Sequence, residues 1–308
     1  MVKSDEPATN LLCQGMVIAE TYYRESASGN REWFNPEDVE VARDERAHIV
    51  GATLRNDGKP VQIGGIEKMA KSKNNGVDPQ TMVDKYGADT VRLFSMFAAP
   101  PEHLLEWREA GVEGMARFLR RLWRDLHAHA TQPEHAQVDV SALTATQKAL
   151  RRQTHETIAK VSDDFSRRLS FNTAIAALME LLNALGRFDD MSDQGRAVRR
   201  EAFEAIVLLL NPITPHICHA LWHTLRSGEP IIAQAWPKAD PAALTKDAVT
   251  LAVQINGKLR GTIEAAVGAQ REEVEKAALA DPGVAKFLAG AMVKKIIVVP
   301  GKIVNIVI

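Results

Sequence analysis

Disulfides, membrane-spanning runs and a charge excess are all missing from this sequence. Cys13 and Cys218 are the only cysteines among 308 residues and lie far apart, which excludes a disulfide framework and argues against a cysteine-based zinc site. No apolar run approaches the roughly 20 residues of a membrane-spanning helix. The formal net charge is −1, from 38 basic and 39 acidic residues, which argues against nucleic-acid binding through overall charge alone. We expect a multidomain protein of the reducing cytoplasm that does not enter membranes.

Self-contained catalytic motifs are missing too. The sequence contains neither a P-loop pattern G-x-x-x-x-G-K-[ST] nor a Rossmann pattern G-x-G-x-x-G, and spacing assembles no Ser-His-Asp or Cys-His pairing. His216, His219 and His223 would share one face of a predicted helix beside Cys218, but three helical histidines without a nearby carboxylate are an unusual zinc site. We therefore favour a core helix and expect that this chain binds no metal.

The most distinctive segment that is present covers residues 66–76, which we call the lysine loop. Lys68, Lys71 and Lys73 alternate with small or flexible residues, and the Asn and Gly residues that follow permit tight turns. Mobile ammonium groups can meet the β- and γ-phosphate oxygens of ATP in a transition state and so lower the barrier. A solvated basic loop is the alternative, and the loop taken alone favours it, because short lysine patterns recur by accident. We expect this loop to be mobile.

Residues 11–66 are predicted to be β-rich, because short apolar runs alternate there with turn residues. Arg43–Ile49 and Lys59–Ile63 are predicted strands within this segment. Most aromatic side chains lie in a core, so we expect a small aromatic core rather than a base-stacking surface. The residues of this predicted core are Tyr22, Tyr23, Trp33 and Phe34.

Helical signals begin directly after the lysine loop. Asp78 and Gly87 bound a predicted helix over Pro79–Tyr86, and Asp89 is expected to cap the helix that follows. Residues 102–226 have apolar side chains at helical spacing throughout. The predicted helices there run over Val112–Ala130, about Leu143–Arg168, from a cap at Asn172, over about Gly195–Leu210, and from Thr214-Pro215 to Leu225. Amphipathic helices joined by short links predict an antiparallel bundle.

One helix of this bundle carries arginines opposite its apolar side. We call Arg117, Arg120, Arg121 and Arg124 the arginine stripe. Arginines on a solvent face without interleaved acids are typical of binding to a nucleic-acid backbone, although such a helix standing alone is more often simply solvated. Both interpretations stay open on this evidence.

The apolar period changes from helix to strand near residue 247. Alternating apolar residues flank Asn256-Gly257, a strong hairpin signal. The pattern predicts a small ββααββ domain. Its later elements are a helix over Arg271–Ala280, a shorter helix from Asp281-Pro282 to Gly290, and a hairpin of Lys295–Val299 and Lys302–Ile308 around Pro300-Gly301.

Several segments of the sequence resemble a known family. KMAKSKNNGVDPQTMVDKYGADTVRLFSMFAAP resembles the KMSKS signature and the following helices of class I aminoacyl-tRNA synthetases. GMVIAETYYRE, GVEGMARFLRRLW, LNPITPHICHALW and VQINGKLRG…VPGKIVNIVI are similar to leucyl enzymes of the bacterial type. The similarity covers essentially the whole chain in order, and isoleucyl, valyl and methionyl relatives do not share this C-terminal domain. It implies the C-terminal portion of a leucyl-tRNA synthetase, a monomeric ligase that uses ATP, leucine and tRNA(Leu).

The resemblance implies a predominantly helical, multidomain α+β fold in four parts. These would be the end of the catalytic core with a β-rich leucine-specific insertion (1–66), the signature loop with stem-contact helices (67–101), a helix bundle of the anticodon-binding type (102–240), and a C-terminal tRNA-binding domain (245–308).

The resemblance also assigns roles to residues. Lys68, Lys71 and Ser72 would be catalytic, with Lys71 binding ATP, which enters as its Mg complex. Arg117 and Arg121 match bundle arginines that face tRNA, in agreement with the arginine stripe. The expected tRNA(Leu)-binding residues are therefore those of the stripe, Arg117, Arg120, Arg121 and Arg124, together with Lys295 and Lys302 of the C-terminal domain.

The sequence departs from the family pattern in two ways. Ala70 stands where the signature has its first serine, and no H-x-G-H motif occurs. The resemblance therefore implies a fragment that binds ATP and leucine only with a missing N-terminal half and shows no leucine-dependent pyrophosphate exchange alone. A free-standing RNA-binding module and a purely structural helical scaffold are the alternatives.

Overall fold

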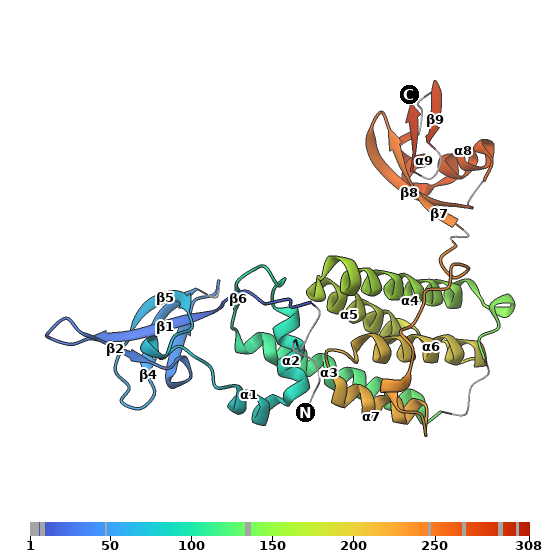
Figure 1. Cartoon of the computed structure of the whole chain (residues 1–308). Helices are drawn as coiled ribbons and strands as arrows, with labels where there is room; N and C mark the ends of the chain where they lie inside the picture. Colours follow the sequence, from blue (N-terminus) through green and yellow to red (C-terminus); the bar gives the residue numbers. More distant parts are fainter. Residues whose placement is uncertain are drawn as a thin grey trace. The chain divides into compact units, whose positions relative to one another are not determined.

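The computed structural model describes residues 6, 10–46, 48–132, 137–245, 248–266, 269–288, 292–299 and 302–308. It divides into two compact units, Met1–Ala243 and Leu244–Ile308. Over the described residues the fold is mixed α/β with three small sheets (Figure 1). The division into four domains stays a prediction. Within those same ranges, no helix is long and apolar enough to cross a membrane.

Strand β1 (Val17–Glu25) is central to the first sheet. It pairs antiparallel with β2 (Arg31–Phe34) and β5 (Gln62–Lys68), and parallel with β6 (Leu105–Glu106). The predicted strand at Lys59–Ile63 is strand only from its fourth residue, where β5 begins. β5 leads directly into the lysine loop.

β3 (Val39–Arg43) and β4 (Ile49–Leu54) form a separate hairpin. The prediction of a strand over Arg43–Ile49 is therefore wrong. Between the two strands the chain turns at Asp44. The carboxylate of Asp44 accepts the backbone N–H groups two and four residues further on, at 2.9 and 2.8 Å, and so bends the chain.

Only half of the predicted aromatic core is buried together. Tyr22 has no exposed surface, and Phe34 packs against the same cluster. The other members of this cluster are Val39, Val41, Ala52, Leu54 and Val61. Successive strand residues point to opposite faces, so Tyr23 and Trp33 lie outside it, with their ring centroids 5.1 Å apart. The prediction is confirmed for the first pair and wrong for the second.

Helix α1 (Pro79–Tyr86) has the predicted limits because both of its ends are set locally. The carboxylate of Asp78 accepts the N–H groups of Gln80 and Thr81 at 3.2 and 3.3 Å. Gly87 ends the helix with a φ of 85°, which favours glycine.

The predicted cap at Asp89 is wrong, because this residue lies inside α2 (Ala88–Phe97) and caps a distant helix instead. Its carboxylate accepts the N–H of Ile217 at 2.7 Å and bonds Nδ1 of His216 at 3.0 Å. Both partners lie at the start of α7 (Pro215–Leu225), where a negative charge is favourable.

Arg92 lies on the next turn of α2 and contacts the C-terminal end of a helix, whereas Asp89 contacts the N-terminal end of one. It donates to the carbonyl oxygens of Ile213 and Pro212 at 2.8 and 3.1 Å, just past the end of α6 (Asp193–Leu210). A positive charge is favourable at a helix C-terminus. The helices that follow the lysine loop are therefore tied to the α6–α7 corner.

Helices α3 (Glu109–Ala130), α4 (Ala145–Asp163), α5 (Phe171–Arg187), α6 and α7 pack around one apolar core (Figure 1). The long helix predicted to reach Arg168 ends instead in a π-helical turn, Asp164–Arg168, whose buried first carboxylate accepts the Thr173 hydroxyl at 2.7 Å. The predicted cap at Asn172 is also wrong. Asn172 lies in the first turn of α5, and Ser170 is at the N-cap.

The chain after α7 packs along α4. Nε1 of Trp236 donates to the hydroxyl of Ser162 at 2.8 Å, and its ring centroid lies 5.5 Å from that of Phe165. These contacts hold the segment that leads towards the second unit against the bundle.

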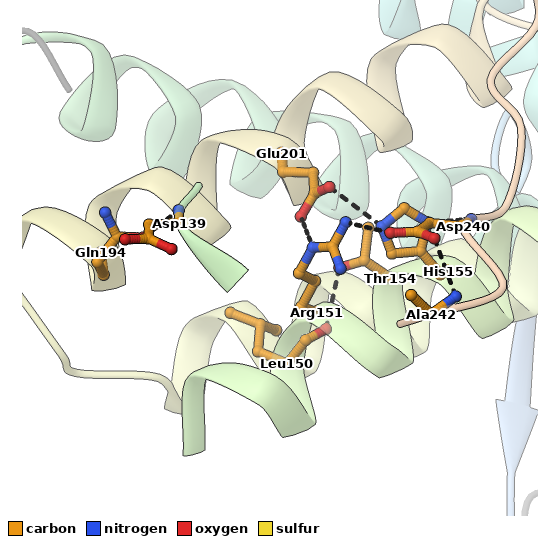
Figure 2. Close-up of polar contacts among 9 residues, drawn as sticks. All are labelled: Asp139, Leu150, Arg151, Thr154, His155, Gln194, Glu201, Asp240 and Ala242. Atoms are coloured by element: carbon orange, nitrogen blue, oxygen red, sulfur yellow. Dashed lines mark hydrogen bonds and ion pairs between the residues drawn. The ribbon is translucent and has the colours of Figure 1, made fainter. Parts of the chain in front are cut away.

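A polar network continues this attachment (Figure 2). The guanidinium of Arg151 donates to Glu201 at 3.1 Å and to Asp240 at 2.8 Å. His155 accepts the N–H of Asp240 at Nδ1 (3.1 Å), so its Nε2 carries the proton that Glu201 accepts at 3.0 Å. The network joins α4, α6 and the segment after α7.

The second unit has the predicted ββααββ order. Its elements are β7 (Ala248–Ile255), β8 (Lys258–Ala266), α8 (Arg271–Ala280), α9 (Pro282–Leu288), β9 (Lys295–Val299) and β10 (Ile303–Val307). The strand order is β8-β7-β10-β9, with β7 and β10 parallel. Asn256 and Gly257 have φ values of 46° and 80°, as their hairpin turn requires. The predicted helix end at Gly290 and turn at Pro300-Gly301 lie outside the described residues.

Candidate functional site

The lysine loop has a defined conformation. After β5 ends at Lys68, the chain forms a 3-10 turn over Lys71–Lys73, and Asn74 then adopts a left-handed φ of 48°. The next residue, Asn75, is fully buried and hydrogen-bonds to the loop backbone. This packing counts against the prediction that the loop is mobile.

The three lysines of the loop, which the sequence did not distinguish, have different surroundings in the structure. Lys73 pairs with Glu67, and its ammonium lies 5.6 Å from the ring centroid of Trp33. Lys68 and Lys71 are exposed, and neither has an ion pair or side-chain hydrogen bond in the described part of the chain. These two ammonium groups can approach a phosphate without first breaking an ion pair. Ser72, the third predicted catalytic residue, is exposed beside them.

Ala70 occupies the N-cap position of the 3-10 turn. Its φ and ψ are −147° and 140°, the extended geometry of an N-cap, and no side-chain oxygen accepts a hydrogen bond from the turn. A serine at this position would offer such an oxygen. The departure from the KMSKS signature therefore removes a possible cap and leaves both exposed lysines in place.

The β1–β2 hairpin borders the loop on one side. The side-chain amide of Asn35 donates to the carbonyl of Gly76 at 3.2 Å, and that of Asn74 donates to the carbonyl of Trp33 at 3.4 Å. The small β-rich region is thus in direct contact with the loop.

The arginine stripe is less uniform than predicted. Arg117 lies 4.0 Å from Glu113, and Arg124 bonds Asp125 at 2.9 Å, so acids are interleaved and the prediction of an acid-free face is wrong. Arg120 is exposed, and no ion pair of it occurs among the described residues.

Arg121 is only partly exposed. Its Nε is buried without a hydrogen-bond partner in the described structure. Of the four arginines, Arg120 thus keeps the most hydrogen-bonding capacity that is both unused within the described residues and open to solvent.

A groove of about 790 Å³ opens beside the stripe, between the α1–α2 corner, α3 and α7. Arg120 and Trp123 line it from α3, and Lys85 and His216 line it from α1 and α7. Trp123 is 42% exposed. The sequence alone does not reveal this groove, because its walls are distant in the chain, although a tryptophan inside an arginine run was a usable signal.

His216, His219 and His223 are exposed on α7, and only Cys218 of this cluster is buried in the core. Folding brings the Asp89 carboxylate to His216, so the premise that no carboxylate is in reach is wrong. Within the described residues, no group of at least three His, Cys, Asp or Glu side chains could hold a metal ion. Burial raises the pKa of Cys218 to about 12, so it is a core thiol.

In the second unit, Lys295 lies on β9 and Lys302 lies just before β10, and both are exposed. Arg260 lies over the Phe287 ring, with 4.0 Å between its Cζ and the ring centroid. The assignment of Lys295 and Lys302 to RNA binding stays a prediction.

Comparisons with known proteins agree with this arrangement. Residues 61–107 match the family model for class I tRNA synthetases (I, L, M and V), and residues 147–276 match that for the anticodon-binding domain of tRNA ligase. The leucine-tRNA ligases of Stenotrophomonas maltophilia and Xanthomonas oryzae pv. oryzae are 69% and 67% identical to the chain over 100% of its length. The resemblance to bacterial leucine-tRNA ligases is confirmed.

The chain spans 35% of the length of these ligases and corresponds to their C-terminal part. A solved ternary complex of an Agrobacterium radiobacter LeuRS with tRNA and LeuAMS is 28% identical to it, with a TM-score of 0.65 over 78% of this chain and 31% of that one. The lysine loop lies inside the class I match, whereas the arginine stripe lies between the two family matches.

Proposed function

We propose that this chain is the C-terminal part of a leucine-tRNA ligase. The intact enzyme would activate leucine with ATP, supplied as its Mg complex, and transfer it to tRNA(Leu). The observation that carries this proposal is the 69% identity to such a ligase over the whole chain. The loop geometry supports it, because two exposed lysines without an ion pair in the described part of the chain lie within the class I match.

Each part of the chain would then have its own role in the intact enzyme. The β-rich region would be the leucine-specific insertion, α1 and α2 would contact the tRNA stem, and the bundle and the second unit would hold tRNA. The enzyme would act as a monomer in the cytoplasm.

The lysine loop would serve the activation step. Attack of the leucine carboxylate on the α-phosphate places negative charge on the departing pyrophosphate. Lys71, with Lys68 and Ser72 beside it, would meet the β- and γ-phosphate oxygens as this charge develops. Contacts made mainly in the transition state raise the rate without trapping the substrate.

Binding of tRNA(Leu) by the chain itself tests the RNA-binding half of the proposal. Arg120→Ala is expected to weaken binding by about 3- to 10-fold at low salt and to reduce the salt slope by about 0.7 to 0.9, as expected for one lost phosphate contact. Titration at several salt concentrations measures both quantities.

The matched control is Arg167→Ala. Arg167 is also exposed and lies in the same unit, but it is held by Asp163 through two hydrogen bonds of 2.6 and 2.7 Å. This variant is expected to bind like wild type. Equal losses in both variants, or binding that does not respond to salt, would contradict a specific role for the stripe.

A free-standing RNA-binding module is the second candidate, favoured by the stripe and its adjoining groove. The two candidates predict different sequences in the reading frame upstream of Met1. An in-frame H-x-G-H motif, and leucine-dependent pyrophosphate exchange by the longer product, would decide for the ligase.

A further inference from the structure

Asn75 is the one fully buried polar residue of the lysine loop as the structure describes it. Its Oδ1 accepts the N–H of Ala70 at 2.9 Å. Its Nδ2 lies 3.4 Å from the carbonyl oxygens of both Glu67 and Lys68 and donates to them. One side chain therefore joins the end of β5 to the start of the 3-10 turn.

Glu67 and Lys68 are the last residues of β5 that pair with β1, opposite Ala19 and Ile18. The N–H of Met69 still bonds to the carbonyl of Val17 at 3.0 Å, but the chain turns away from β1 at the next residue. A buried backbone group without a partner is strongly unfavourable. A carboxamide supplies an acceptor and two donors together, which neither a carboxylate nor an aliphatic side chain can do.

The left-handed conformation of Asn74 makes the contact possible. With a φ of 48°, the chain reverses direction there, and the following side chain reaches back to the strand it has just left. The exposed Lys71 lies inside the segment that this reversal encloses.

We propose that Asn75 is a positioning residue for the lysine loop. It fixes the main chain beside Lys68 and at the start of the turn that carries Lys71. The two exposed ammonium groups are thereby held in one arrangement before the nucleotide arrives, and Asn75 itself does not touch the substrate. This inference rests on the proposed function, because it is the phosphates of ATP that the arranged lysines would meet.

Kinetics of the full-length ligase test the inference. Asn75→Ala is expected to lower kcat for leucine-dependent pyrophosphate exchange by about tenfold or more, with a smaller change in KM for ATP, because misplaced lysines lose transition-state contacts first. Asn75→Asp keeps the acceptor for Ala70 but faces two carbonyl oxygens with a carboxylate, so it is expected to be at least as impaired. Both variants are expected to remain folded at the assay temperature, although the lost hydrogen bonds lower their melting temperature by a few degrees.

Asn74→Gly is the matched control. Glycine accepts the left-handed conformation, and the substitution removes only the 3.4 Å contact to the Trp33 carbonyl. Its kcat is expected to stay within about twofold of wild type.

Hydrogen exchange on the chain itself gives a second readout that does not depend on ATP. The amide of Ala70 should lose protection in Asn75→Ala and keep it in Asn74→Gly, and trypsin should cleave after Lys71 faster in the first variant. Wild-type kcat in Asn75→Ala, or a fall in kcat that is fully explained by the fraction of enzyme unfolded at the assay temperature, would overturn the inference while leaving the proposed function intact. A wild-type full-length enzyme without exchange activity would overturn both.

Discussion

Lys71→Ala in the full-length ligase proposed to contain this chain is expected to lower kcat for leucine-dependent pyrophosphate exchange by about 10²- to 10³-fold, the usual loss when one contact to developing charge is removed. Lys71 is exposed, and the described structure shows no ion pair that holds it away from a phosphate. KM for ATP should change much less than kcat, because the contact forms mainly as charge moves to the departing pyrophosphate. Steady-state exchange kinetics at saturating leucine measure both constants.

Lys73→Ala is the control for this prediction, since it removes the same charge two residues away. Lys73 is already occupied by Glu67, and the two side chains are 31% and 40% exposed. Because Glu67 holds this ammonium, its removal is expected to lower kcat by less than about tenfold, and an ion pair as exposed as this contributes at most about 1 kcal/mol to stability. Equal losses at the two positions would show that the loop acts through its total charge.

Local signals explain which elements the sequence predicted well. The limits of α1 follow from Asp78 and Gly87, whose contacts lie within a few residues of them. The Asn256-Gly257 hairpin likewise needs only the left-handed conformations of its two turn residues. In both cases the residues that set the structure are neighbours in the chain, and a sequence pattern can record them.

Distant partners explain the elements that were predicted wrongly. Asp89 is of a residue type that often caps the helix it begins, but its carboxylate bonds the start of α7, 128 residues away. The π-helical turn after α4 depends on the buried carboxylate of Asp164 and on Thr173 of the next helix. No pattern within one window of the sequence reports such partners.

In the candidate site, too, local features were visible in the sequence and contacts between distant segments were not. The lysines were visible in the sequence, but the pairing of Lys73 with Glu67 and the burial of Asn75 depend on how β5 runs into the loop. The groove beside Arg120 depends on three separate segments. Resemblance identified the loop from its sequence, whereas the structure was needed to distinguish the paired Lys73 from the exposed Lys68 and Lys71.

Arg151→Met is expected to lower the free energy of unfolding of the first unit by about 3 kcal/mol, because it leaves two carboxylates of a partly buried network without their cation. The side chain of Arg151 is 10% exposed, whereas those of Glu201 and Asp240 are 26% and 36% exposed. Partial hydration of the two acids sets the expected loss at the lower end of the range for buried pairs. Methionine keeps most of the side-chain volume, so the loss reports the charge network and not a cavity.

Urea unfolding of the chain, followed by helical circular dichroism, measures this loss. Arg167→Met is the control, because Arg167 and Asp163 are 73% and 40% exposed, and the change is expected to be below about 1 kcal/mol. A loss below about 1 kcal/mol for Arg151→Met as well would show that the network does not stabilise the bundle.

The pH dependence of the same experiment identifies Asp240 as one of the groups responsible. Its hydrogen bond to Arg151, and then that to the Ala242 N–H, hold the pKa of Asp240 below its ordinary value. A carboxylate with a lowered pKa stabilises the folded state above its unfolded pKa of about 3.9, and this contribution is lost as pH falls through the folded value. Wild type should therefore lose more stability than Arg151→Met when the pH is lowered from 5 towards 2, and the difference between them should shrink. A difference that stays constant over this interval would place the effect of Arg151 on packing and not on its charge.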